Sequence, residues 1–389
     1  MPDGRRTTRR NVLRTTAAAA GVGAVAGCTS YGGSDEETDD GGDGNASNDG
    51  DSDDGSSGPY SVTMEPVGTV EFDGVPETWV ANNGSWADMG VALGREPPEA
   101  VWLPSRYHTQ YYDEIPGVSP DKSGMVRLSD DGVDPEKFYE IDADVHVIDP
   151  NFLTGRWSDS WSMDDVEEVE RVTGGPFFGN SIFSTGYAWH EDYPYLSLYE
   201  AFGKLAEVFQ RTDRYEAFVD LHDEFQSTLD DVVPPEGERP AVAIMWAAGN
   251  DPDEFSPYLI GEGTSFKQWR DLQVRDAFAE TDVRDFHETR GRVDYETLLD
   301  IDPEIIMFRG HEAQTREEFR NTLVANMESN DTAKQLTAVQ NGDVYRGGPL
   351  YQGPITNLVV TERAAQQVYG VEEELFDRER VADIVAGDV

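Results

Sequence analysis

Basic residues are scarce in this chain, and lysine above all. Its 389 residues hold 30 Lys and Arg against 77 Asp and Glu, for a formal net charge of −47, and five of the 30 basic residues are lysine. Binding to polyphosphate needs clustered cations, so this scarcity argues against nucleic acid or an anionic membrane surface as a direct partner. A dense carboxylate surface holds water and cations, and salt screens its self-repulsion. The composition predicts a halophilic protein.

Cysteine and catalytic motifs are also rare or missing. Cys28 is the one cysteine, which excludes an internal disulfide and a thiolate metal cluster. The six histidines include no pair at i, i+4, so we expect no direct metal site. The sequence holds no G-x-S-x-G, no P-loop and no G-x-G-x-x-G after a strand. We therefore expect neither an enzyme nor a bound cofactor.

No apolar run is long enough to cross a membrane, but the N-terminus carries a shorter one. The sequence T-R-R-N-V-L-R at residues 8–14 precedes an alanine-rich run that ends V-A-G-C at Cys28. This resembles a twin-arginine export signal, with Arg9 and Arg10 as the pair, and a lipobox whose Cys28 is lipidated after cleavage. Residues 1–27 are then the signal, and the protein is anchored by lipid alone on the outer face of the cell membrane.

An acidic tether follows the anchor at residues 28–59. Between Thr29 and Gly58 the chain has ten acidic and no basic residues, set among Gly and Ser. Such a segment cannot bury enough apolar surface to fold. It indicates location and not activity.

From Tyr60 onward, short β-branched or aromatic runs alternate with segments of helical period. This pattern predicts an α/β protein of two lobes, each a mainly parallel sheet flanked by helices. The expected strands are Thr78–Ala81, Ala100–Leu103, Val145–Ile148 and Phe177–Phe183 in the first lobe (60–194), and Ala241–Trp246, Ile305–Phe308 and Val344–Tyr345 in the second (236–389).

A long helical stretch from Tyr195 to Val233 joins the lobes. Thr212 and Asp213 resemble an N-cap that divides it in two, and Pro234–Pro235 ends it. Residues 195–235 thus form one stiff helical connection, which predicts little bending between the lobes. Shorter helices are expected at Trp86–Leu93 and Met163–Val172.

Several motifs occur in a familiar order: V-P-E-T-W-V-A-N (75–82), D-A-D-V-H-V-I-D-P (142–150), L-L-D-I-D-P-E-I-I-M-F (298–308) and A-V-Q-N-G-D-V-Y-R (338–346). With the lipobox and the long joining helix, they resemble the substrate-binding proteins of ABC importers for ferric siderophores, haem and cobalamin, here of a haloarchaeal type. The resemblance covers residues 65–370. It implies a monomer that captures an iron(III)–siderophore complex and delivers it to an ABC permease with its ATPase subunits.

The chain departs from that family at residues 105–137, where it is longer and rich in Tyr, Pro and Gly. Elsewhere, aromatic residues and arginines follow the predicted strands, at the edge where open α/β sheets bind ligands. Flat rings and guanidinium forks suit a bulky, partly apolar, anionic ligand. The expected ligand contacts are Trp86, Arg156, Trp157, Trp161, Tyr187, Trp189, Trp246, Tyr258, Arg309 and Tyr351.

The resemblance also implies an acidic residue on each lobe that pairs with arginines of the permease. Glu296 occupies the matching place in the second lobe, and Asp165, Glu167 or Glu168 in the first.

Other functions remain open on the sequence alone. Cobalamin would use stacked aromatics with less need of arginine, and haem could take His190 or Tyr187 as a ligand. A lipid-anchored extracellular hydrolase is a further alternative. The sequons at Asn45, Asn83 and Asn330 would suit a structural surface protein.

Overall fold

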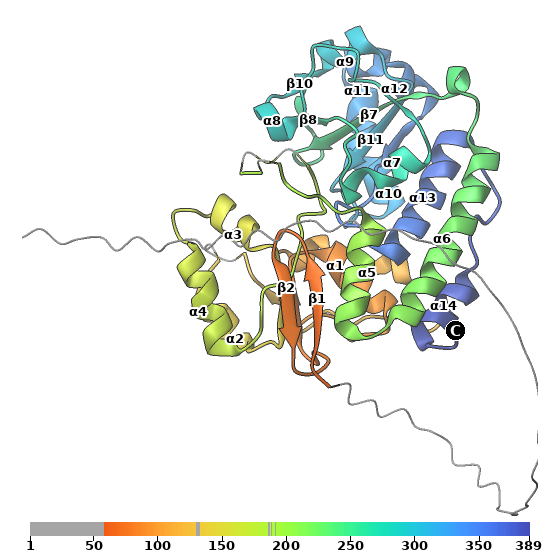
Figure 1. The fold of residues 1–389 in the computed structure, drawn as a ribbon. Helices are drawn as coiled ribbons and strands as arrows, with labels where there is room; N and C mark the ends of the chain where they lie inside the picture. Colours follow the sequence, from red (N-terminus) through yellow and green to blue (C-terminus); the bar gives the residue numbers. More distant parts are fainter. Residues whose placement is uncertain (1–57, 130–132, 186, 188, 191) are drawn as a thin grey trace, which may run out of the picture. The chain divides into compact units, whose positions relative to one another are not determined.

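The computed structural model describes residues 58–129, 133–185, 187, 189–190 and 192–389 (Figure 1). The predicted export signal, Cys28 and nearly all of the acidic tether lie outside these residues. Within the described part of the chain, no helix has both the length and the apolar character needed to span a bilayer.

The first lobe is built on a four-stranded sheet in the order β5-β4-β3-β6, and every pairing in it is parallel. Its strands are Trp79–Ala81 (β3), Ala100–Val101 (β4), Val126–Arg127 (β5) and Val145–Val147 (β6). The strand predicted at Phe177–Phe183 is wrong: one parallel bridge joins His146 to Phe177, and the chain then turns irregular. A hairpin that the sequence analysis missed, Tyr60–Met64 (β1) with Gly68–Phe72 (β2), precedes the sheet.

The second lobe holds a six-stranded sheet in the order β10-β8-β7-β11-β12, with β9 paired to β7. Its central pairs β7–β11 and β11–β12 are parallel, whereas β8 runs antiparallel to β7 and β10. The strands are Ala241–Ala247 (β7), Glu254–Tyr258 (β8), Arg275–Asp276 (β9), Val293–Asp294 (β10), Ile305–Arg309 (β11) and Val344–Arg346 (β12). The predicted α/β fold of two mainly parallel lobes is confirmed.

Helices cover both sheets. They are Gly84–Ala92 (α1), Pro135–Ile141 (α2), Pro150–Arg156 (α3), Met163–Thr173 (α4), Leu198–Phe209 (α5), Thr212–Val232 (α6), Lys267–Asp271 (α7), Phe286–Thr289 (α8), Tyr295–Ile301 (α9), Arg316–Phe319 (α10), Ala325–Ser329 (α11), Thr337–Asn341 (α12), Pro354–Tyr369 (α13) and Arg378–Ala386 (α14). Short turns include the 3-10 helices Pro104–Arg106 (η1) and Thr109–Tyr112 (η2), and a π-helical turn at Arg320–Val324 (η5).

The predicted joining stretch is a pair of helices, α5 and α6, and α6 leads into β7 (Figure 1). The predicted N-cap is displaced: α6 begins at Thr212 itself, and Arg211 stands at the cap position without a side-chain bond. The helix ends before the two prolines as predicted, with Val233 at its C-cap. Helix α13 packs on both α1 and α7, so the lobes share contacts beyond the joining helices.

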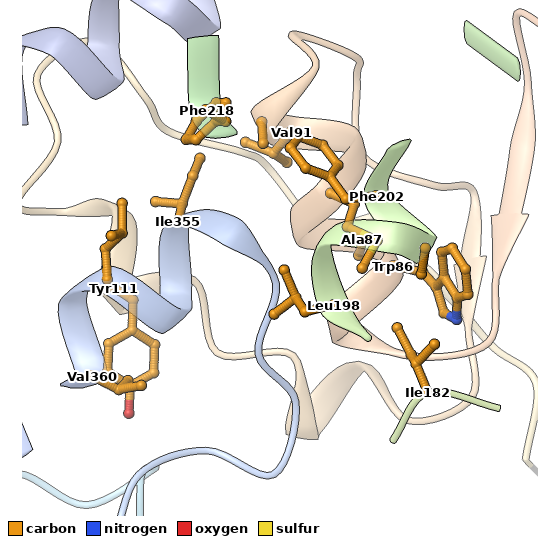
Figure 2. Packing of buried hydrophobic residues seen from close by; sticks show 14 of the residues in the cluster. Trp86, Ala87, Val91, Tyr111, Ile182, Leu198, Phe202, Phe218, Ile355 and Val360 are labelled. Carbon is orange, nitrogen blue, oxygen red and sulfur yellow. The ribbon is translucent and has the colours of Figure 1, made fainter. Parts of the chain in front are cut away.

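One hydrophobic cluster runs through both lobes. Strand side chains alternate between faces, so Val242 and Ile244 of β7 enter this shared cluster while Ala243 and Met245 pack on the outer face of their sheet. Helices α1, α5, α6 and α13 contribute side chains to the same cluster, and Figure 2 shows Trp86, Leu198 and Ile355 within it. The continuous core joins the two lobes into one compact unit across the described residues.

Candidate ligand-binding cleft

A cavity of about 390 Å³ lies where the strands of both lobes end. Its first-lobe lining consists of Asn82, Asn83, Trp102, Arg106, Phe152, Arg156, Asn180, Ser181, Ile182, Phe183 and Tyr187. Its second-lobe lining consists of Trp246, Ala248, Glu254, Ser256, Tyr258, Phe286, His287, Arg290, Arg292, Arg309, Leu350 and Tyr351.

Local sequence explains much of this lining. Asn82 and Asn83 directly follow β3, Arg309 is the last residue of β11, and Trp246 stands one residue before the end of β7. In parallel sheets these carboxyl ends meet at one edge, where ligands bind. Gly310 has a φ of +84°, and a Cβ there would lie 2.1 Å from the Trp246 ring. Only glycine therefore lets the chain turn after Arg309 while the indole keeps its place.

Aromatic side chains form the walls, and a second layer of rings supports them. Trp102 lies with its ring centroid 4.1 Å from that of Trp157, which stands behind it. Tyr187 stacks on Trp189 at 4.6 Å, with their planes 15° apart. Because ring pairs of this kind stabilise by about 0.5–1.5 kcal/mol beyond simple burial, the second layer holds the lining rings in place.

Arg309 forms the buried cationic part of the cavity lining. The residue is 1% exposed, and both of its Nη atoms are without a hydrogen-bond partner among the described residues. The guanidinium lies over the rings of Phe266 at 4.5 Å and Tyr258 at 4.9 Å. Burial lowers the pKa of Arg309 to about 10, so the group stays cationic at neutral pH. A desolvated charge without a counter-ion is unfavourable, and an anionic ligand would relieve it.

Four more arginines line the same cavity. Arg106 lies over Trp246 at 5.5 Å, Arg156 over Trp157 at 5.0 Å and Arg290 over Phe286 at 5.2 Å. None of these three forms an ion pair with a carboxylate of the described chain. Arg292 does pair, with Glu254 at 3.8 Å, and Glu254 is the one carboxylate residue among the described residues of the lining. A chain of charge −47 thus presents a cationic cavity.

Of the ten predicted contact residues, six line the cavity: Arg156, Tyr187, Trp246, Tyr258, Arg309 and Tyr351. The other four do not. Trp157 and Trp189 stand behind the lining, whereas Trp86 is 1% exposed within the shared core. Trp161 is 2% exposed and its indole donates to the Val133 carbonyl oxygen at 2.7 Å, so it serves the first lobe's own packing.

Sequence analysis missed Arg106, Trp102, Arg290 and Arg292. Trp102 directly follows β4, so a shorter strand assignment would have exposed it as a strand-end residue. Arg106 lies in the segment that departs from the family, and Arg290 and Arg292 follow the short helix α8 rather than a strand. No periodicity marks these three positions.

His190, weighed as a haem ligand, does not line the cavity. Its ring stacks on Tyr193 at 3.9 Å, its Nδ1 lies 2.6 Å from the Tyr195 hydroxyl, and burial lowers its pKa to about 4. Among the described residues, no group of three or more His, Cys, Asp and Glu side chains could hold a metal ion.

The acidic residues expected at the permease differ in their local roles. Glu296 is exposed in the first turn of α9, and Glu167 is exposed on α4. Asp165 accepts hydrogen bonds from the Ser162 amide at 2.8 Å and the Ser162 hydroxyl at 2.6 Å, closing a capping box at the start of α4.

Comparison with known proteins shows which proteins this chain is similar to. A family model described as periplasmic binding protein matches residues 174–350. No curated protein matches the sequence.

Among solved structures, a periplasmic binding protein from Veillonella parvula aligns at a TM-score of 0.55 with 16% identity, over 82% of this chain and all of that one. The siderophore-binding protein BauB, solved with two acinetobactin molecules and ferric iron, aligns at 0.54 with 18% identity, over 81% of this chain and 100% of that one. FeuA from Bacillus subtilis, solved with ferri-bacillibactin, aligns at 0.52 with 13% identity, over 79% and 98%. The chain has the fold of two-lobed periplasmic binding proteins, and its family match and structural neighbours are substrate-binding proteins rather than enzymes.

Proposed function

We propose that this chain is an extracytoplasmic solute-binding protein that captures an iron(III)–siderophore complex and delivers it to an ABC permease and its ATPase subunits. The observation that carries the proposal is Arg309, a buried guanidinium that lines an aromatic cavity and has no counter-ion among the residues that the structure describes. Iron(III) held by catecholate or carboxylate groups is a bulky anion with apolar parts. Such a ligand supplies the missing negative charge and offers flat surfaces to the rings.

The wider lining supports the same ligand class. Arg106, Arg156 and Arg290 surround the space without a carboxylate partner among the described residues, so their charge is available to a ligand. BauB and FeuA, which share the fold, were solved with ferric siderophores. Cobalamin has less use for this number of cations.

The deciding experiment is a titration of intrinsic tryptophan fluorescence, because Trp102 and Trp246 line the cavity. The probes are the iron(III) complex of a tris-catechol chelator, the iron(III) complex of a tris-hydroxamate chelator, cobalamin and haemin. We expect the anionic tris-catechol complex to quench most strongly. Arg309→Ala should weaken its binding roughly 10- to 100-fold, the loss of one buried charge-assisted hydrogen bond of about 1.5–3 kcal/mol.

The matched control is Trp161→Phe, which lies away from the cavity and should bind the complex as the wild type does. Equal affinity in the wild type and the Arg309 variant would remove Arg309 from the site. Quenching by cobalamin alone would move the ligand assignment to cobalamin.

Delivery requires anchoring and docking. In this proposal Cys28 carries the lipid, Arg9 and Arg10 route the folded chain to export, and Glu296 with Glu167 contacts the permease. Asp165 is the weaker candidate because its carboxylate already caps α4. Glu296→Arg should abolish uptake while affinity in solution stays unchanged, and uptake at the wild-type rate would refute the docking role.

A further inference from the structure

The segment that departs from the family begins with two short 3-10 turns, η1 and η2. Within residues 104–114, here called the clasp, Arg106 reaches the cavity and lies 5.5 Å over the Trp246 ring of the second lobe. Tyr107, Tyr111 and Tyr112 all turn inward and are at most 4% exposed. A surface insertion has no need of three buried tyrosines, so these side chains require a structural explanation.

Two clasp residues bond to Glu312 in the second lobe. The Tyr111 hydroxyl donates to the Glu312 carboxylate, and the Gln110 amide donates to the Glu312 carbonyl oxygen at 3.0 Å. The carboxylate itself has no exposed surface, and Arg363 of α13 binds it through both Nη atoms, at 3.0 and 3.2 Å. Glu312 follows the ligand-lining Arg309 by three residues, so the clasp is fixed next to the cavity.

The same segment also bonds to the first lobe. The Tyr112 hydroxyl donates to Asp88 of α1 at 2.5 Å and lies 3.0 Å from the Tyr107 hydroxyl. Asp88 accepts the amides of Ile355 and Thr356, both at 3.1 Å, in the first turn of α13. The clasp therefore contacts α1 and the loop after β11 directly. It is linked to α13 indirectly, through the carboxylates of Asp88 and Glu312.

The contact of the clasp with Glu312 is expected to persist in concentrated salt because the Glu312 carboxylate is charged and buried. Burial by itself would raise the pKa of Glu312, but Arg363 lowers it to about 2, so the carboxylate stays ionised and its hydrogen bonds are charge-assisted. Buried pairs are screened by salt much less than exposed ones. In a protein whose surface suits concentrated salt, this contact persists where surface ion pairs weaken.

We infer that residues 104–114 clasp the two lobes together and thereby position Arg106 as a specificity-determining contact for anionic ligands. The inference rests on the proposed function of the cavity. Arg106 enters from the first lobe and Arg309 from the second, so a ligand between them is held by cations from both sides. The separation of these two cations is fixed by the clasp and not by the joining helices alone.

A double-mutant cycle tests the inference. Gln110→Ala/Tyr111→Phe removes both clasp bonds to Glu312 and leaves the Glu312–Arg363 pair intact, so this variant should fold. With the iron(III) tris-catechol complex as probe, Arg106→Ala should weaken binding at least tenfold in the wild type and less than threefold in the clasp variant. Tyr139→Phe, on α2 beyond the clasp, is the matched control and should leave the Arg106 effect at full size. Equal Arg106 effects in all backgrounds would overturn the inference.

A second measurement needs no ligand. Amide hydrogen exchange of the free protein should accelerate in the clasp variant at residues 104–114 and 346–351, with β7 unchanged. Unchanged exchange at these segments would show that the clasp bonds do not hold the lobes, and would overturn the inference by itself. If no ferric chelate binds the wild type, the proposed function fails, and the exchange result still decides the clasp.

Discussion

Two arginines of the second lobe, Arg363 and Arg309, have opposite electrostatic surroundings. Arg363 of α13 binds the buried Glu312 carboxylate with both Nη atoms, and that carboxylate raises the pKa of Arg363 despite the opposing effect of burial. Arg309 on the cavity is buried without a carboxylate partner among the described residues, and burial lowers its pKa to about 10. The charge of Arg363 is neutralised by a carboxylate of the same chain. The charge of Arg309 in the cavity lining is left for an anionic ligand.

The difference separates a structural cation from a functional one. Removing one member of a buried ion pair leaves the other charge buried without a partner, which is strongly destabilising. Removing an unpaired buried cation leaves no such charge behind. Stability measurements should therefore respond to Arg363 and binding measurements to Arg309.

The largest expected effect is on folding. Arg363→Met leaves Glu312 with only Arg346, 3.9 Å away, as a cationic neighbour. The free energy of unfolding should fall by about 3–5 kcal/mol, near the lower end because Arg346 remains. Arg309→Met should leave it unchanged or raise it. Urea unfolding of both variants at one salt concentration measures this, and equal losses would erase the distinction between the two arginines.

Acid should weaken the clasp through Glu312. Its folded pKa of about 2 lies below the ordinary value of 4.5, so its contribution is present above about pH 4.5 and is lost as pH falls toward 2. A shift of this size corresponds to roughly 3 kcal/mol. Glu312→Gln should remove this part of the acid sensitivity. Parallel pH–stability curves for the wild type and the variant would contradict the assignment.

Asp88 is the buried carboxylate that accepts a hydrogen bond from Tyr112 of the clasp, and its pH dependence should have the opposite sign to that of Glu312. Burial raises its pKa to about 6, so its contribution is greatest below about pH 4 and is lost as pH rises through 6. Asp88→Asn should therefore match the wild type near pH 4 and gain up to roughly 3 kcal/mol by pH 7, which is the free energy that a pKa raised from 3.8 to about 6 corresponds to. A variant less stable than the wild type at pH 7 would show that the ionised form is favoured.

The smallest effect is expected at the exposed rim of the cavity. Arg290 is solvent-exposed and lies over Phe286 at 5.2 Å. Exposed charges contribute about 0–1 kcal/mol and act mainly on the association rate. Arg290→Ala should reduce affinity for the tris-catechol complex less than threefold and slow association at low salt. Stopped-flow quenching tests this, and a loss as large as that of Arg309→Ala would place Arg290 in the desolvated part of the site.

Local sequence determined the fold class and part of the cleft. Apolar strands bounded by turn residues place Trp246 and Arg309 at strand ends. Because the carboxyl ends of parallel strands meet at one edge of the sheet, both residues then lie where ligands bind. Runs that are predicted as strands can still be irregular: Phe177 forms one parallel bridge with His146 of the edge strand β6, and the described residues from Phe178 to Phe183 form no strand.

Tertiary structure alone decided which rings and cations face the ligand. Trp86 and Trp161 carry the same side chain as Trp246, yet contacts from other elements bury them in packing. The bond from Tyr111 to Glu312 spans 201 residues of sequence, and no spacing rule reaches that far. The periodicity of a segment and the neighbours of a residue in sequence predict only the helix or strand to which the residue belongs. The free energy of a buried charge depends on the group, distant in sequence, that the fold brings into contact with it.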